Sequence, residues 1–65
     1  MTIKVNGSDY ETPEGSTVRV LLEQHRLAPD KVAVELNRRL LRAEKYDTIL
    51  RAGDELEIVT FVGGG

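Results

Sequence analysis

The sequence predicts an α+β fold, in which one main helix covers one face of a mixed β-sheet. Its 65 residues allow one small domain, because a chain of this length buries only about 60% of its unfolded surface on folding. Apolar residues recur at helical spacing in one segment and follow strand patterns in the others. The segments follow the order β-β-α-β-β-β, and a single helix can cover only one face of a sheet.

The amino-terminal part predicts a β-hairpin. Residues 2–6 alternate apolar and polar side chains, and residues 8–12 form the return strand, with Tyr10 as its large apolar side chain. Asn6-Gly7 between them suits a two-residue turn, since both residues tolerate positive φ. Pro13 ends the second strand because it cannot donate to a sheet ladder.

One amphipathic helix follows the hairpin. Ser16 or Thr17 is its expected N-cap, and the helix should end near His25 or Arg26. Its apolar face consists of residues at positions i, i+3 and i+4: Val18, Leu21 and Leu22.

Two strands are predicted after the helix. A connector at 28–31 leads to a strand at 32–36 that is rich in β-formers. The chain then turns at 37–39 and forms a short strand at 40–42. Residues 43–50 form an irregular segment anchored by three apolar side chains: Tyr46, Ile49 and Leu50.

A tight turn at 52–54 leads to the last strand, residues 55–62. This strand is the most apolar one and therefore belongs in the middle of the sheet. The best-known arrangement with this order is the β-grasp (ubiquitin-like) roll. The helix should pack on apolar residues of three strands: Ile3, Val5, Val34, Leu36, Leu56 and Ile58.

Composition excludes several classes of function. There are 9 Lys and Arg against 11 Asp and Glu, a formal net charge of -2, which argues against a nucleic-acid binder. Cysteine is absent and histidine occurs once, which excludes thiolate nucleophiles and sulfur-ligated or histidine-rich metal sites. No apolar stretch approaches the roughly 20 residues of a membrane span, and the amino end lacks a hydrophobic signal region. We therefore expect a cytoplasmic protein without a membrane partner.

No pair of residues suggests catalysis, so the sequence predicts no catalytic residue and no metal ligand. His25 lies near the helix end, where an imidazole meets free carbonyls. Glu55 and Glu57 lie on an open sheet face, where paired acid–base work is not expected. The one basic cluster is either a solvated hairpin or a contact to an acidic partner surface. It consists of Arg38, Arg39 and Arg42.

The last strand is expected to expose two apolar side chains. Its buried face, by period two, holds Leu56, Ile58 and Thr60. Glu55 and Glu57 mark the opposite face as the solvent face. Val59 and Phe61 share that face, and we predict that together with Val62 they dock another protein.

The sequence ends in Val62-Gly63-Gly64-Gly65. Glycine loses the most backbone freedom on folding, so we expect a flexible tail at 62–65. A tail without side chains fits a narrow channel. Gly63 and Gly64 would thread into a partner and present the α-carboxylate of Gly65. A carboxylate becomes an acyl donor only when its oxygen is made a good leaving group, so a nucleotide-dependent enzyme must adenylate it first.

Four segments together carry a resemblance to a known family. They are Thr17-Val18 with Leu21-Leu22, Val32-Ala33-Val34-Glu35-Leu36-Asn37, Gly53-Asp54 and Phe61-Val62-Gly63-Gly64-Gly65. With this length and order of elements, the chain resembles the ThiS family, the sulfur carrier proteins of thiamine biosynthesis. The resemblance covers nearly the whole chain and implies a single β-grasp domain over residues 1–65.

The resemblance also implies a reaction cycle. An E1-like enzyme of the ThiF type would use ATP to adenylate Gly65, and the carrier itself would bind no cofactor. A sulfur donor such as a cysteine desulfurase would convert the adenylate to a thiocarboxylate, whose sulfur passes to thiazole synthase of the ThiG type. The protein would be a co-substrate and not an enzyme. Two alternatives are a MoaD-like carrier for molybdopterin synthesis and an unmodified ubiquitin-like interaction module.

Overall fold

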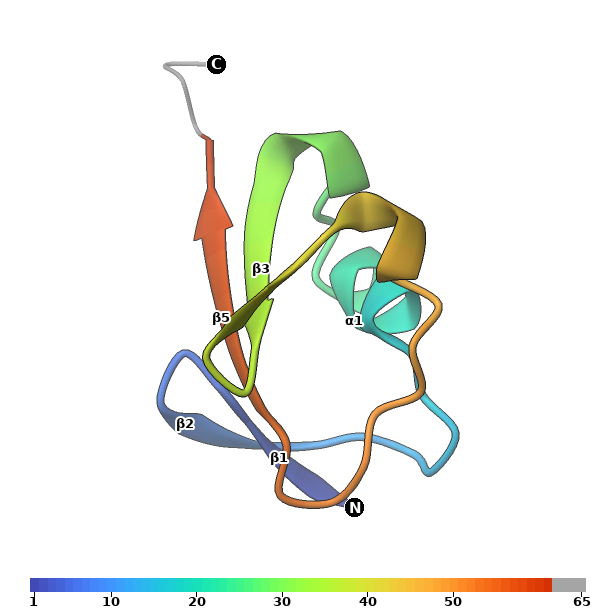
Figure 1. The fold of residues 1–65 in the computed structure, drawn as a ribbon. Helices are drawn as coiled ribbons and strands as arrows, with labels where there is room; N and C mark the ends of the chain where they lie inside the picture. Colours follow the sequence, from blue (N-terminus) through green and yellow to red (C-terminus); the bar gives the residue numbers. More distant parts are fainter. Residues whose placement is uncertain (62–65) are drawn as a thin grey trace.

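A computed structural model describes residues 1–61, in which one helix lies across one face of a β-sheet (Figure 1). The elements are β1 (Thr2–Val5), β2 (Ser8–Glu11), α1 (Val18–Gln24), η1 (Pro29–Lys31), β3 (Val32–Leu36), β4 (Arg39–Leu41), η2 (Ala43–Lys45) and β5 (Glu55–Thr60), where η denotes a 3-10 turn. No helix in this part of the chain is long and apolar enough to cross a membrane. The predicted tail at 62–65, and with it the extent of the domain, lies outside the described residues.

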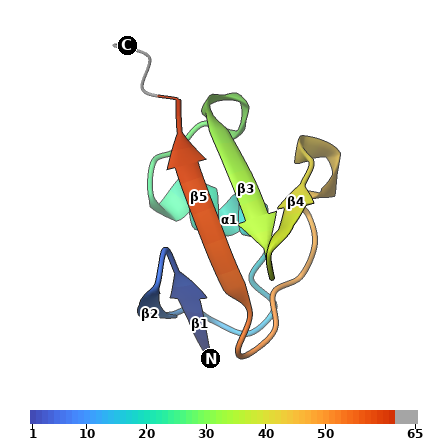
Figure 2. The same ribbon diagram turned by 60° about the vertical axis from the view of Figure 1, so that its left-hand side comes forward.

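The strands form one sheet in the order β2-β1-β5-β3-β4, which can be followed in Figure 2. β5 lies in the centre, parallel to β1 and antiparallel to β3. The outer pairs, β1 with β2 and β3 with β4, are antiparallel hairpins. The predicted α+β class, mixed sheet and central last strand are confirmed, and the arrangement is that of the β-grasp. The last strand ends at Thr60, earlier than the predicted residue 62.

Both hairpins use two-residue turns that begin with asparagine and have positive φ at both residues. The turn residues are Asn6 (φ 51°), Gly7 (φ 85°), Asn37 (φ 52°) and Arg38 (φ 71°). The second turn is therefore one residue shorter than the predicted turn at 37–39. Since Leu36 pairs directly with Arg39, β4 begins at Arg39 and not at residue 40.

The two turn asparagines bind the central strand from opposite sides. Asn6 Oδ1 accepts a hydrogen bond from the Ile58 N–H at 2.7 Å, and Asn6 Nδ2 donates to the Ile58 carbonyl at 3.3 Å. On the β3 side, Asn37 Oδ1 accepts from the Glu55 N–H at 3.0 Å, and its Nδ2 donates to the Asp54 carboxylate at 3.0 Å. Side-chain amides thus extend both ladders of β5 beyond their backbone bonds.

One of the two residues predicted as the N-cap of helix α1 is confirmed. The Thr17 hydroxyl accepts a hydrogen bond from the Val20 N–H at 3.1 Å, so Thr17 is the N-cap. The other candidate, Ser16, is buried and its hydroxyl donates to the Pro13 carbonyl at 2.6 Å.

The helix ends at Gln24, one or two residues before the predicted end. Arg26 takes a left-handed conformation with φ 58°, and its N–H donates to the Glu23 carbonyl at 3.0 Å. The next N–H, of Leu27, reaches back to the Leu22 carbonyl at 2.8 Å. These two bonds form a Schellman motif, which turns the chain away from the helix axis.

The core lies between α1 and the sheet. Its buried apolar side chains include Ile3, Val18, Leu21, Leu22, Val32, Val34, Tyr46, Leu50 and Leu56. Three side chains predicted for the core pack against it but are only half-buried: Val5, Leu36 and Ile58. A helix of seven residues makes about two turns and covers only the middle of the sheet, which leaves the strand ends partly open.

Two further expectations about burial are wrong. Ile49 does not anchor the irregular segment, because its side chain is 60% exposed. It forms an isolated antiparallel bridge with Thr17, and in extended backbone its side chain points opposite to that of the buried Leu50. Thr60 is exposed, since it lies beyond the part of the sheet that α1 covers.

Replacing core side chains should separate the fully buried from the half-buried positions. We expect Leu21→Ala to cost about 2–5 kcal/mol of unfolding free energy, because it leaves a cavity under the helix. Ile58→Ala should cost about 1–2 kcal/mol, because less of its surface is buried. Urea unfolding measures both, with Ile49→Ala as a surface control below about 0.5 kcal/mol. Equal costs at Leu21 and Ile58 would contradict this account of the core.

The asparagine bonds to β5 make a second prediction. Asn6→Gly keeps the positive φ of the turn but removes both bonds to Ile58, so it should lower the unfolding free energy by about 1–2 kcal/mol. Asn6→Asp keeps the acceptor for the Ile58 N–H and should lose less. Urea unfolding again gives the comparison, and an Asn6→Gly variant as stable as the parent chain would show that the side-chain bonds do not hold β5.

Candidate functional site

β5 leads directly to the point where the predicted tail begins. The Phe61 N–H donates to the Lys31 carbonyl at 2.8 Å, so the backbone is bonded to its neighbour up to residue 61. Figures 1 and 2 show this end of β5 at one extreme of the molecule. The residues assigned to the tail and its chemistry lie outside the described residues, and their roles stay predictions: Val62, Gly63, Gly64 and Gly65.

The sheet face opposite α1 carries the predicted docking residue Val59, and Phe61 follows the end of β5 directly, where it also lines a hollow on the helix side. Val59 is 60% exposed and Phe61 is 57% exposed, which confirms their expected exposure and leaves their docking role a prediction. Val59 pairs with Ala33 of β3. Leu40 of β4 lies on the same face and is 66% exposed. We call Ala33, Leu40, Val59 and Phe61 the outer patch.

Sequence reasoning missed the two outer-patch residues that belong to β3 and β4. Leu40 pairs with Glu35, and Glu35 pairs with Glu57 across β3 and β5, so these side chains share the outer face. Period two along residues 32–36 already places Ala33 with Glu35 on that face. The face of Leu40 depends on the register of β4 against β3, and this register follows only once the turn is known to be 37–38 and not 37–39.

Negative charge lies beside the outer patch. Glu35 and Glu57 are direct cross-strand partners, and like charges in that position repel each other. Among residues 1–61 neither forms an ion pair. Lys4 lies on the neighbouring strand β1, but it pairs with Asp9 at 2.8 Å, and that hydrogen bond raises the pKa of Lys4. The outer face therefore presents apolar surface next to carboxylates, which does not suit a nucleic-acid backbone.

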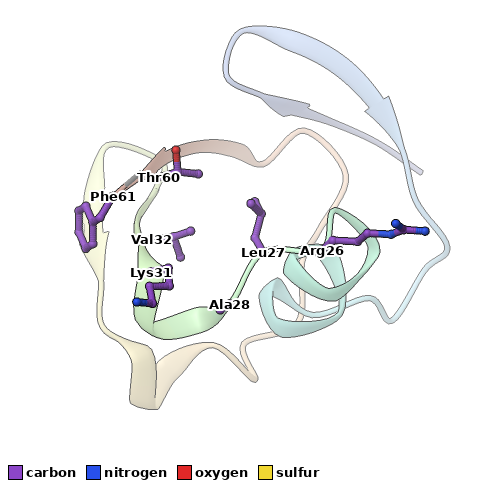
Figure 3. Close-up of a pocket in the computed structure, with 7 residues that line it drawn as sticks. All are labelled: Arg26, Leu27, Ala28, Lys31, Val32, Thr60 and Phe61. Carbon is purple, nitrogen blue, oxygen red and sulfur yellow. The ribbon is translucent and has the colours of Figure 1, made fainter. Parts of the chain in front are cut away.

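We call residues 60–61, where β5 ends, the tail root. A hollow of about 520 Å³ opens on its helix side (Figure 3). Its lining residues are Arg26, Leu27, Ala28, Lys31, Val32, Thr60 and Phe61. The hollow is present because α1 ends at Gln24 and leaves the carboxyl end of β5 uncovered. In Figure 3 the Arg26 side chain extends away from the other labelled residues. The sequence carried no signal for this hollow, since helix periodicity does not say how far a helix reaches over a sheet.

Two further polar side chains of the described residues serve the fold. His25 Nδ1 lies 2.9 Å from the Leu21 carbonyl oxygen, the contact expected of an imidazole at a helix end. Arg19 pairs with Asp47 at 2.8 Å, and this hydrogen bond raises the pKa of Arg19. In the described part of the chain, no three His, Cys, Asp or Glu side chains gather as a metal site. The arrangement holds a fixed strand end beside an exposed apolar patch.

Comparison with known proteins agrees with this geometry. Residues 3–65 match the model of the ThiS family. A crystal structure of the thiamine biosynthesis protein ThiS from Geobacter metallireducens superposes with a TM-score of 0.82 at 35% identity, covering all of both chains. The sulfur carrier protein ThiS of Bacillus subtilis is 35% identical over 65 residues, which are 97% of this chain and 98% of that protein.

The chain is also similar to part of a larger protein. It is 38% identical over 66 residues to a thiazole synthase of Magnetococcus marinus, and the match covers 100% of this chain and 20% of that protein. The chain thus spans about a fifth of that relative's length, as it does for a second thiazole synthase, from Paramagnetospirillum magneticum. The family match covers nearly every residue, and the solved structure shares the fold over its whole length. The chain belongs to the ThiS family.

Proposed function

We propose that this protein carries sulfur in thiamine biosynthesis, on the α-carboxylate of Gly65. An E1-like activating enzyme of the ThiF type joins this carboxylate to the α-phosphate of ATP and releases pyrophosphate. The terminal sulfur of a persulfide, such as that of a cysteine desulfurase, then attacks the acyl carbon, and AMP leaves. A thiol cleaves the sulfur–sulfur bond and frees a thiocarboxylate, which gives its sulfur to thiazole synthase of the ThiG type.

Membership of the ThiS family over residues 3–65 carries this proposal. The fold supports it, because the outer patch lies at the same end of the sheet as the tail root. An enzyme that binds Val59 and Phe61 receives whatever follows residue 61 at a defined position. Four extended residues span about 13 to 14 Å, which is enough to cross the rim of a partner's active site.

In this scheme the protein is a co-substrate and not a catalyst. It binds no cofactor of its own, and ATP binds to the activating enzyme. Thiazole synthase as a partner is supported by the two thiazole synthases that contain a region similar to this chain. We place these reactions in the cytoplasm, where the activating enzyme has access to ATP.

The outer patch makes a prediction about docking. Val59→Asp and Phe61→Asp should each weaken binding to the purified activating enzyme by about 2 kcal/mol or more, because a carboxylate replaces an apolar contact. Ile49→Asp is a matched control, since Ile49 is also 60% exposed and lies outside the outer patch. Calorimetry measures binding, and circular dichroism should be native for all three variants. Normal binding by both outer-patch variants would rule out this docking role.

The tail makes a prediction about chemistry. Deleting Gly65 shortens the tail by about 3.3 to 3.6 Å, and adding one residue moves the carboxylate off its target by as much. Reacting atoms must approach within about 3.5 Å, so both changes should stop or severely slow adenylation. Gly64→Val should also fail, because a β-branched side chain widens the tail and restricts its conformations.

Intact mass after reaction with ATP, a sulfur source and the activating enzyme tests this prediction. The parent chain should gain the mass difference between one sulfur and one oxygen. A thiocarboxylate formed at full rate on the extended variant would contradict Gly65 as the modified residue. An unmodified parent chain would favour the interaction-module alternative, and sulfur transfer to a molybdopterin precursor would assign the MoaD-type role.

A further inference from the structure

The hairpin of β3 and β4 carries three arginines, which we call the basic hairpin: Arg38, Arg39 and Arg42. Arg38 lies in the turn, Arg39 begins β4, and Arg42 follows its last residue. All three are exposed. Among residues 1–61 none of them forms an ion pair. The fold therefore supplies no partner for this positive charge within its described part.

Arg38 takes a backbone conformation that costs it energy. Its φ is 71°, the left-handed region, and the equivalent residue of the first hairpin turn is Gly7 with φ 85°. Glycine adopts such a conformation without steric cost, whereas a residue with a Cβ does not. The same turn geometry thus occurs twice in one chain, once with the residue that suits it and once with arginine.

The fold gives a structural reason for the residues next to Arg38 but none for an arginine at position 38. Asn37 bonds to Glu55 and Asp54, so its place in the turn has a structural reason. Arg39 and Arg42 flank an edge strand, where charged side chains discourage pairing with other chains. Among the described residues, the Arg38 side chain forms no hydrogen bond and no ion pair, although its backbone is strained. The left-handed conformation of Arg26 ends α1 through the two backbone hydrogen bonds of the Schellman motif. At Arg38 the strain coincides with two neighbouring arginines that form no ion pair in the described residues, which suggests a contact outside the chain.

The basic hairpin lies far from the tail root. Asn37 bonds to the start of β5, and the tail root follows its end. The strand has six residues, and at about 3.3 Å per residue it separates the two ends by about 20 Å. Figure 2 shows the β3–β4 hairpin and the carboxyl end of β5 at opposite ends of the sheet. A single standard interface is wide enough to include both ends.

Under the proposed function, two enzymes must bind the same carboxylate. Both enzymes therefore need access to the same end of the carrier. Surface elsewhere on the carrier, which only one of them contacts, would distinguish the two. In the two thiazole synthase relatives, the similar region is part of the synthase chain itself. A tethered domain meets its synthase at high effective concentration without a second docking surface, which points to the activating enzyme as the partner of the basic hairpin.

We propose that the basic hairpin docks an acidic surface of the activating enzyme and so distinguishes that enzyme from thiazole synthase. This inference rests on the proposed function. Arg38 is the central residue, because it lies in the turn between β3 and β4 and is exposed. A nucleic acid does not fit as the ligand: the chain has a net charge of -2, and Glu35 and Glu57 lie on the adjoining sheet face, where they would repel phosphates.

The test removes one positive charge from the basic hairpin and, separately, one positive charge outside it. Arg38→Gln removes the charge and keeps a left-handed side-chain-bearing residue. Lys45→Gln is the control, since Lys45 lies outside both the basic hairpin and the hollow at the tail root, is exposed and forms no ion pair among residues 1–61. Arg38→Lys keeps the charge. Arg38→Gly removes both the charge and the strain, so it should raise the urea midpoint of unfolding while it weakens docking. A variant that is more stable yet binds less tightly cannot be explained by misfolding.

Binding is measured with the purified activating enzyme and, separately, with purified thiazole synthase. We expect Arg38→Gln and Arg38→Gly to weaken binding to the activating enzyme by about three- to tenfold at low ionic strength, with the difference shrinking in about 0.5 M salt. Arg38→Lys should retain most of the affinity. Binding to thiazole synthase should not change. Parent-like affinity of Arg38→Gln, an equal loss for Lys45→Gln, or an equal loss with both enzymes overturns the docking role.

Thiocarboxylate formation separates this inference from the function on which it rests. If the parent chain acquires sulfur and Arg38→Gln binds the activating enzyme like the parent chain, the basic hairpin has no docking role and the sulfur-carrier function stands. If the parent chain is neither modified nor bound by the activating enzyme, both proposals are wrong.

Discussion

The position of β5 is the constraint on which the rest of this small fold depends. It is the only strand of the described sheet that joins the two hairpins, with β1 on one side and β3 on the other. Two asparagine side chains, Asn6 and Asn37, add hydrogen bonds where the backbone ladders end. Because β5 is held along both edges, the backbone that follows it starts from a defined point. Under the proposed function, such an origin determines where the reacting carboxylate can be presented.

The length of α1 decides which side chains of the sheet are buried. Leu21 and Leu22 are fully buried under its centre, whereas Ile58 is half-buried and Thr60 is exposed. The Schellman motif at Arg26 ends the helix before it reaches the carboxyl end of β5. The same shortness therefore gives both the partial burial of Ile58 and the hollow beside the tail root. Small domains bury a limited share of their surface, and here the uncovered share lies next to the candidate site.

Much of this structure could be predicted from the sequence, because its patterns are local. Asn6-Gly7 indicates its hairpin turn directly, and period two correctly placed Val59 on the solvent face. The predictions that failed concern residues whose burial or register is set by residues distant in the sequence. Asn37 tolerates positive φ as Asn6 does, but arginine at position 38 does not indicate it, and so the register of β4 was missed. Ile49 is apolar but exposed because its bridge to Thr17 fixes its orientation, and only the tertiary structure contains that bridge.

Under the proposed function, recognition and reaction lie on separate parts of the chain. The reaction takes place at Gly65 in a partner's cavity, and the described sheet offers the surface that the partner binds. Sheet positions such as Val59 are fixed by cross-strand pairing, so a docking face built there is preorganised and loses little entropy on binding. In such a carrier the partner's affinity and the reacting group can change independently, because no side chain has to serve both.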